Sequence, residues 1–340
     1  MTRVDLIVPT FNGTDLLRAC LRSLRASTFT DYQLWVVDDG STEPIAPVVA
    51  RAAPGGQIIR FEQNVGLTRG LNAAIARGAG EYVVLLNNDT EVEPDWLASL
   101  VRCADEHPRA GSVASKMRLM SDRTRLHSAG DYYSVRGMPG NRGVWMFDAG
   151  QYDQQKHVFS ACGGAALYRR AALATVDRGG GEIFDERLFM YCEDVDLAWR
   201  LWRQKWECVY CPDAVVYHAL SATAGGKLAS YYVARNLWLV IARSIPRGVL
   251  PDRQRVIAYH FGRFARDLRH AREPAARAAL RGTLAGLALA AGDWRRRPTV
   301  SDGERQRLRA LLSDSRLSPA LPAAATLCSR SSQTRDGTAG

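Results

Sequence analysis

The chain has 340 residues, of which 46% are hydrophobic and 24% charged, the proportions of an average soluble globular protein. This composition excludes a collagen-like, mucin-like or wholly disordered chain. The net charge of +10 is concentrated near the C-terminus, because residues 225–340 carry 21 Lys or Arg against 8 Asp or Glu. Such a segment predicts an anionic partner (phospholipid, a pyrophosphate-linked substrate or nucleic acid), and the alternative is a solvated helical surface.

Strands and helices alternate through the first third of the chain. Strand-like apolar runs cover residues 4–9, 34–37, 57–61 and 82–86. The stretches between them repeat apolar residues every three or four positions, which is typical of helices with one buried face; they cover residues 15–26, 64–77 and 95–106. This alternation predicts an α/β fold with a mostly parallel sheet that helices cover on both faces.

The middle of the chain, about residues 110–220, has a less regular pattern. Residues 130–150 look like a long loop or a loosely paired hairpin, and residues 159–170 are strand-like around Gly163 and Gly164. A helix is predicted over 193–204 and a strand over 209–217. We therefore expect one main domain over 1–224, a basic helical extension over 225–312 and a disordered tail over 313–340.

The cysteines and the N-terminal residues allow a prediction of the cellular compartment. Seven cysteines are scattered along the chain, and the sequence enters a strand within a few residues of Met1. We therefore expect no signal peptide, reduced cysteines and a cytoplasmic protein. Cys208 and Cys211 form a C-x-x-C pair without a second pair, which favours a short strand over a zinc site.

Polar clusters follow three of the predicted strands: Pro9 to Gly13, Asp38 to Ser41, and Asn87 to Thr90. Because the carboxyl ends of parallel strands meet at one edge of a sheet, we expect these clusters to lie together there, where ligands gather. Ordinary turn chemistry is the alternative for each cluster alone.

Two aspartates in these clusters suit metal and nucleotide binding. Asp89 directly follows a buried strand and could hold Mg²⁺ or Mn²⁺ together with substrate phosphate; it could also be a helix N-cap. Asp39 could hydrogen-bond a base or ribose, or form an Asp-Gly turn with Gly40. The chain has neither G-x-G-x-x-G after its first strand nor G-x-x-x-x-G-K-[ST], which counts against Rossmann dehydrogenases and P-loop NTPases.

A third acidic group opens the helix predicted over 193–204. Glu193, Asp194 and Asp196 lie where the helix dipole favours negative charge, with apolar flanks that allow burial of one of them. A partly desolvated carboxylate near a cleft could act as a general base, and simple charge decoration of the helix start is the alternative. His218 follows the last strand as a possible metal ligand or a core histidine.

Taken in order, these motifs resemble family 2 glycosyltransferases with the GT-A fold, a Rossmann-like, mostly parallel central sheet flanked by helices. The resemblance covers roughly residues 3–245. The later pieces are similar to the rhamnosyltransferase-type branch. The motifs are Ile7 to Asn12, Val36 to Thr42, Asn64 to Gly66, Leu85 to Thr90, Gly163-Gly164, Phe184 to Glu186, Tyr191 to Asp196 and Tyr217-His218.

The resemblance implies a role for each matched position. Asp194 would be the catalytic base with Glu193 beside it, and Asp89 and His218 would hold the metal, Mn²⁺ or Mg²⁺. Asn87 stands where the family has the first acid of its D-x-D motif. The residues expected to bind the nucleotide-sugar are Pro9, Phe11, Asp39, Arg69, Asn87, Asn88 and Gly164.

We therefore expect an inverting, metal-dependent glycosyltransferase. It would move a sugar, with rhamnose as one candidate, from a nucleotide-diphosphate donor to a glycan or lipid-linked acceptor in cell-surface polysaccharide assembly. Aromatic and basic residues over 231–247 suggest an amphipathic helix on the inner face of the membrane. The alternatives are an inactive nucleotide-sugar-binding or membrane-surface scaffold and, with no recognised module to support it, a nucleic-acid-binding protein.

Overall fold

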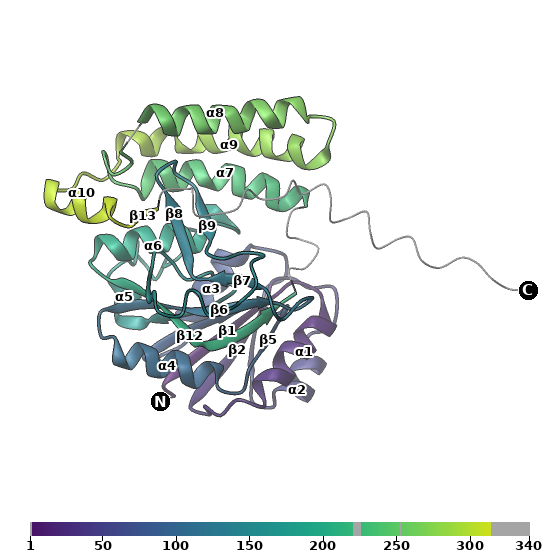
Figure 1. Cartoon of the computed structure of the whole chain (residues 1–340). Helices are drawn as coiled ribbons and strands as arrows, with labels where there is room; N and C mark the ends of the chain where they lie inside the picture. Colours follow the sequence, from purple (N-terminus) through teal and green to yellow (C-terminus); the bar gives the residue numbers. More distant parts are fainter. Residues whose placement is uncertain (1, 220–225, 252, 314–340) are drawn as a thin grey trace, which may run out of the picture.

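The structure, a computed structural model, describes residues 2–219, 226–251 and 253–313. In this part of the chain a ten-stranded sheet forms the centre of the molecule (Figure 1), and a three-stranded sheet lies beside it. The strands of the large sheet are β1 (Val4–Thr10), β2 (Tyr32–Asp38), β3 (Gln57–Arg60), β4 (Tyr82–Leu86), β5 (Thr90–Val92), β6 (Ala110–Leu119), β7 (Leu126–Ala129), β10 (His157–Val158), β11 (Ala165–Arg169) and β12 (Glu207–His218). The small sheet contains β8 (Asp131–Ser134), β9 (Pro139–Asn141) and β13 (Leu312–Ser313).

Helices cover both faces of the large sheet. The helices of the N-terminal half are α1 (Thr14–Leu24), α2 (Ala46–Ala52), α3 (Leu67–Ile75) and α4 (Trp96–Glu106). They are followed by α5 (Arg170–Ala174), the 3₁₀ turn η1 (Glu186–Leu188), α6 (Glu193–Arg203), α7 (Lys227–Arg243), α8 (Arg253–Arg269), α9 (Pro274–Arg295) and α10 (Asp302–Arg309).

The sheet separates two hydrophobic cores. Alternate residues of a strand point to opposite faces, so Ile7 of β1 joins the core beneath α3 and α6, whereas Leu6 and Val8 join the core beneath α1 and α4. The largest buried side chains are Trp199 in the first core and Trp96 in the second. This two-sided burial explains why these strands read as continuous apolar runs.

Strand order confirms the predicted α/β sheet and adds to it. The strands β3, β2, β1 and β4 are parallel neighbours, β11 runs antiparallel between β4 and β6, and β12 is parallel to β6. The carboxyl ends of β1, β2 and β4 therefore lie at one edge, as the polar clusters predicted. Sequence reasoning missed β6, whose apolar pattern is interrupted by Lys116. That side chain is buried, with its Nζ 2.9 Å from Asp153.

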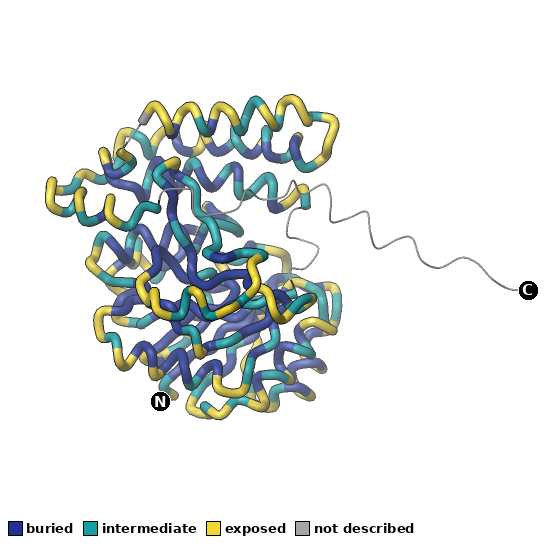
Figure 2. The backbone as a smooth tube through the Cα atoms, in the orientation of Figure 1, coloured by how far each residue is buried: buried dark blue, intermediate teal, exposed yellow. Residues whose placement is uncertain are grey.

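The interpretation of residues 231–247 as an interface helix is wrong. These residues form α7, whose Leu237, Val240 and Ile241 are buried in the same core as Trp199. Helices α7 to α10 follow from Lys227 onward, and the first of them shares a core with the preceding residues. Figure 1 shows α7, α8 and α9 as a layer beside the sheet, and Figure 2 shows that exposed positions of this layer gather on its outer side.

Two further expectations concern the C-terminal part. The predicted disordered tail lies outside the described residues, apart from Ser313 in β13. None of the described helices combines the length and the apolar character that crossing a membrane requires. Cys208 and Cys211 both lie in β12, as the strand interpretation predicted, and the six cysteines of the described part are free.

Candidate active site

The loops after β1 and β2 hold each other in place and leave one aromatic ring exposed. Asn12 has a left-handed backbone (φ 58°); its N–H donates to Ser41 Oγ at 2.8 Å, and its Oδ1 accepts the N–H of Thr42 at 2.9 Å. Phe11, which follows β1 directly after Pro9 and Thr10, remains 52% exposed. An exposed ring on a fixed loop at the sheet edge is available to stack on a planar ligand.

Asp39 contributes to this edge by holding the next loop. Its Oδ1 accepts the N–H of Val65 at 2.7 Å and its Oδ2 accepts the N–H of Gly66 at 3.1 Å. Burial raises the pKa of the Asp39 carboxyl, and these two backbone donors oppose that shift. Arg69 is exposed in the first turn of α3, directly after this loop. Asp39 therefore holds the loop that leads into α3 and the exposed Arg69.

The loop after β4 joins the first cluster to the glycine pair. Asn88 Nδ2 donates to Thr10 Oγ1 at 2.9 Å, which links this loop to the end of β1. The N–H of Asn87 donates to the carbonyl of Gly164 at 2.9 Å. A Cβ at Gly164 would lie 3.3 Å from Asn87 Nδ2 and 3.2 Å from Met117 Cε, so the close approach of the two segments favours glycine there.

Asp89 and His218 meet, as the resemblance implied, and a second histidine joins them. Asp89 Oδ1 lies 3.1 Å from His218 Nε2, and the other ring nitrogen of His218, Nδ1, lies 3.2 Å from Nδ1 of His127. All three side chains are buried. Burial lowers the pKa of His127 to about 3, with the neighbouring His218 as a smaller cause, so its ring is neutral at physiological pH.

Sequence reasoning missed His127, and strand register explains why. Met117 pairs with Ser128 and Arg118 pairs with Leu126, so His127 is the extra residue of a β-bulge in β7. A bulge redirects the side chain it carries. No spacing motif in the sequence connects His127 with residue 218, which lies 91 positions away.

The donor atoms of Asp89 and His218 fit a divalent cation. Neighbouring ligands of an octahedral ion with bonds of about 2.1 Å lie about 3 Å apart, close to the 3.1 Å between Asp89 Oδ1 and His218 Nε2. A site with one carboxylate and one imidazole suits Mn²⁺ better than it suits Mg²⁺, because Mg²⁺ prefers ligands that are all oxygen atoms. His127, whose Nδ1 lies 3.2 Å from Nδ1 of His218, would fix the orientation of the His218 ring by accepting a hydrogen bond from it.

The predicted base lies against the glycine pair. Asp194 Oδ2 accepts the N–H of Gly163 at 2.9 Å, and its Oδ1 accepts the N–H of Val195 at 2.8 Å. Gly164, the residue after Gly163, accepts the hydrogen bond from Asn87, so the glycine pair joins Asp194 to the loop that carries Asp89. Burial raises the pKa of Asp194, and the backbone donors limit the shift.

Glu193 occupies a different environment from Asp194. Its side chain is buried, and its Oε2 has no hydrogen-bond partner among the described residues. Burial, and then the charge of Asp194, raise the pKa of Glu193 to about 8, so it is mostly protonated at neutral pH. Asp194 is the more accessible of the two. This difference favours Asp194 over Glu193 as the proton acceptor.

A further buried acid, Asp131, was not predicted. Its carboxylate, the Asp194 carboxylate and Cys162 Sγ have ligand atoms that all lie within 4.8 Å of one another. Burial, with the charge of Asp194 as a second cause, raises the pKa of Asp131 to about 8. Ser128 Oγ and Asn141 Nδ2 donate to its Oδ1 at 2.8 and 3.0 Å.

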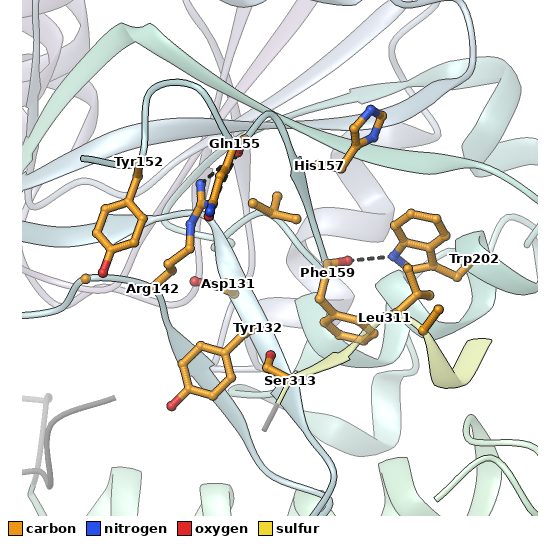
Figure 3. Close-up of a pocket in the computed structure, with 13 residues that line it drawn as sticks. Asp131, Tyr132, Arg142, Tyr152, Gln155, His157, Phe159, Trp202, Leu311 and Ser313 are labelled. Atoms are coloured by element: carbon orange, nitrogen blue, oxygen red, sulfur yellow. Dashed lines mark hydrogen bonds between the residues drawn. The ribbon is translucent and has the colours of Figure 1, made fainter. Parts of the chain in front are cut away.

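Asp131 also lines a cavity of about 410 Å³ between the small sheet and α6. Figure 3 shows aromatic side chains around it, with the indole N–H of Trp202 donating to the carbonyl of Phe159 at 2.7 Å. The cavity walls include Tyr132, Arg142, Tyr152 and Leu311. Asp131 thus connects this aromatic cavity with the carboxylate of the predicted base.

The segment before α6 is strained and is held by α7. Phe189, Tyr191 and Cys192 all have positive φ, between 65° and 67°, which costs free energy for residues with side chains. Asn236, fully buried in α7, donates through Nδ2 to the carbonyls of Leu188, Met190 and Tyr191, the last two at 2.8 Å. Asn236, which sequence reasoning missed, therefore fixes the loop that positions Glu193 and Asp194.

The chain is similar to known sugar-transferring proteins. An N-acetylglucosaminyl-diphospho-decaprenol L-rhamnosyltransferase of Mycobacterium tuberculosis is 28% identical over 254 residues, covering 68% of this chain and 81% of the relative. An N-acetylglucosaminyltransferase of Rhizobium meliloti is 28% identical over 223 residues, covering 63% of this chain and 50% of the relative.

Solved structures show the same fold. A mannosyltransferase from Pyrobaculum calidifontis, in complex with GDP-Man and Mn²⁺, matches with a TM-score of 0.54 at 20% identity, over 91% of this chain and 79% of that one. GalNAc-T7 with UDP, GalNAc and Mn²⁺ matches with a TM-score of 0.54 at 14% identity, over 71% of this chain and 48% of that one. The fold is therefore GT-A-like, as the motifs implied.

The family model for glycosyl transferase family 2 matches residues 5–176, half of the chain, and includes β1 to β4, the Asn87-Asn88-Asp89 loop and the glycine pair. The chain therefore belongs to glycosyl transferase family 2 and is a glycosyltransferase.

Proposed function

We propose that this enzyme transfers a sugar from a nucleotide-diphosphate donor to an acceptor hydroxyl with inversion, using Asp194 as the base. The observation that carries the proposal is the chain of contacts from Asp194 through Gly163 and Gly164 to Asn87. It joins the accessible carboxylate to the loop that holds Asp89 beside His218. A base and a diphosphate-binding pair are thus held on one rigid sheet edge.

In the proposed reaction the acceptor oxygen attacks the anomeric carbon on the side opposite the diphosphate. Its proton passes to the Asp194 carboxylate, a new carbon–oxygen bond forms, and the bond to the diphosphate breaks with its electron pair on the leaving group. One displacement inverts the anomeric configuration. The hydrogen bonds from Gly163 and Val195 hold the carboxylate in place for this transfer.

The nucleotide end of the donor would lie at the loops after β1 and β2. Phe11 supports stacking on the base, Asp39 holds the adjoining loop, and Arg69 supplies positive charge toward the diphosphate. Asp89 and His218 would hold Mn²⁺ or Mg²⁺, which supplies charge neutralisation of the diphosphate when bound.

The names of the relatives support a choice of acceptor. The similar mycobacterial enzyme is a rhamnosyltransferase that acts on a sugar-diphospho-decaprenol, and another relative is an O-antigen biosynthesis protein of Myxococcus xanthus. We propose a lipid-linked glycan acceptor in cell-surface polysaccharide assembly, with rhamnose as the first donor sugar to test and with the enzyme bound peripherally at the inner face of the membrane.

Thermal unfolding with UDP, dTDP or GDP, each with and without Mn²⁺, tests the donor site. A nucleotide at about a hundred times its Kd adds about 2.7 kcal/mol of stability, so one nucleotide should raise Tm by several degrees and Mn²⁺ should increase the rise. Sugar transfer from the corresponding donor to a polyprenyl-diphosphate-linked acceptor then tests the reaction.

Asp194→Asn tests the base. We expect nucleotide-dependent stabilisation to persist and transfer to be lost, whereas the surface variant Asp213→Asn keeps both, because Asp213 is exposed and its carboxylate faces Arg102 of α4. A folded Asp194→Asn protein that still transfers sugar would refute the base assignment. A wild-type protein that binds nucleotide without transfer to any acceptor would favour the inactive scaffold.

A further inference from the structure

Helix α8 carries an exposed apolar stripe. Ile257, Phe261 and Leu268 are 56%, 71% and 59% exposed, and Phe264 lies between them with partial exposure. Their spacing of four, three and four residues places all four on one side of the helix. Large apolar side chains that gather on one surface mark an interaction site more often than scattered ones do.

The stripe is separate from the face through which α8 packs on the molecule. That face contains Val256 and His260, both buried. The His260 ring lies 5.0 Å from the Trp238 ring of α7, and its Nε2 lies 3.2 Å from the carbonyl oxygen of Arg136. Helix α8 therefore packs on the molecule through Val256 and His260, and the stripe remains exposed on another side of the helix.

The stripe belongs to a strongly basic part of the chain. Residues 251–297, which span α8 and α9, contain eleven arginines against four Asp or Glu. Arg255, Arg266 and Arg269 are exposed on α8, on a different side of the helix from the stripe. Exposed leucines also lie on the neighbouring α9, at Leu284 and Leu287.

We propose that the stripe of α8 inserts into the interface of an anionic phospholipid membrane, with the arginines of α8 and α9 at the level of the phosphate groups. Apolar insertion with electrostatic attraction to anionic lipid is how peripheral amphipathic helices bind. The arginines lie on the polar face of the helix, and their long side chains can extend toward the lipid phosphates.

Charge favours a membrane over a second copy of the chain on this surface. A two-fold contact through the stripe would bring the same patch of each copy together, and with it two segments that each carry seven more arginines than acids. Like charges in such a contact oppose association. An anionic lipid surface offers the opposite charge.

This inference deepens the proposed function, because a membrane-bound α8 would bring the site close to a lipid-linked acceptor. Binding to vesicles needs neither donor nor acceptor, so the two proposals are separable. A wild-type protein that is stabilised by nucleotide but does not bind vesicles would contradict this inference alone. Vesicle binding without any response to nucleotide contradicts the donor site alone.

Co-sedimentation of the full-length protein with vesicles tests the inference. We compare vesicles of phosphatidylglycerol and phosphatidylcholine with vesicles of phosphatidylcholine alone, at low and high salt. The stripe variant is Phe261→Ser/Leu268→Ser, and the charge variant is Arg266→Glu/Arg269→Glu. The matched control is Phe147→Ser, which removes a 60% exposed phenylalanine from the loop between β9 and β10.

We expect wild type and the Phe147→Ser variant to bind anionic vesicles equally, with binding weakened by salt. Both α8 variants should bind about tenfold or more weakly, because each removes one of the two attractions. Thermal unfolding confirms that the surface variants are folded. The inference is overturned if wild type does not sediment with anionic vesicles, or if the stripe variant binds as wild type does. It is also overturned if light scattering shows that the wild-type protein is a dimer and that the stripe variant is a monomer.

Discussion

The pair of histidines behind Asp89 allows a direct test of the proposed metal site. If His218 Nε2 binds a metal, its Nδ1 carries the proton and donates it to His127 Nδ1, 3.2 Å away. The neutral ring of His127, kept so by burial, can accept this bond. His127→Leu removes the acceptor, whereas His127→Asn retains an amide oxygen close to the position of Nδ1.

The size of the effect follows from burial. Both histidines are buried, so His127→Leu leaves the Nδ1–H of His218 without a partner, and an unsatisfied buried donor costs about 1–3 kcal/mol. Loss of a partner that orients a metal-binding histidine typically lowers affinity by about 10- to 100-fold, which is about 1.4–2.7 kcal/mol. The two figures agree, and we expect a loss in this range for His127→Leu and a smaller loss for His127→Asn.

Electron paramagnetic resonance of free Mn²⁺, titrated with protein in the presence of the stabilising nucleotide, measures this affinity without any turnover. His157→Leu is the control, because His157 is exposed on β10 and its substitution should leave Mn²⁺ affinity unchanged. Thermal unfolding without metal separates loss of the site from loss of the fold. A folded His127→Leu protein that binds Mn²⁺ as tightly as wild type would refute the orienting role of His127.

Three further predictions concern stability and binding. Phe11→Ala should weaken nucleotide binding by about 1–3 kcal/mol through lost stacking and leave Tm nearly unchanged; calorimetric titration that shows no loss would contradict the stacking role. Because folding raises the pKa of Asp131 to about 8, the folded state binds an extra proton there, and the contribution of Asp131 to stability should fall as pH rises from about 4 to about 8. Asp131→Asn removes this contribution, so its free energy of unfolding should decrease less with pH than that of wild type in thermal unfolding across this range, and an unchanged pH slope would argue against a buried, protonated Asp131. Asn236→Leu should cost about 2 kcal/mol in urea unfolding, from the loss of two N–H donors that three carbonyls share, and lower kcat; an unaltered kcat would show that the loop before α6 does not need Asn236.

Sequence reasoning located the parts of the site that depend on strand order. The ends of parallel strands meet wherever the strands pair, so Phe11, Asp39 and Asp89 could be placed at one edge without coordinates, and the structure places them there. The resemblance assigned His218 to the metal, whereas its place after the last strand alone fits either a metal ligand or a core histidine. The roles of all these residues in catalysis and binding stay predictions.

The parts that sequence reasoning missed depend on side-chain direction and on distant packing. His127 reaches His218 because of a bulge in β7, and a bulge has no clear signature in one sequence. Asp131 pairs with Ser160 through an isolated bridge, which brings it close to Cys162 and Asp194, and one sequence gives no sign of such a bridge. The error at α7 has a related cause: aromatic, aliphatic and basic residues at helical spacing fit a membrane interface and a protein core equally well, and only tertiary packing shows which of them α7 contacts.

The correction at α7 connects the two proposals. Asn236 on α7 holds the strained loop before Asp194, and Trp238, two residues later on the same helix, supports α8 through His260. A membrane that binds the α8 stripe would therefore act on a layer that also fixes the base. Since α7 is packed in the same core as Trp199, a membrane bound at α8 would orient the acceptor side of the site toward the lipid surface. If so, the stripe variant should lower transfer to a membrane-embedded acceptor but leave transfer to a short-chain, water-soluble acceptor unchanged. Equal losses with both acceptors would mean instead that α8 supports the catalytic loop and does not bind lipid for the reaction.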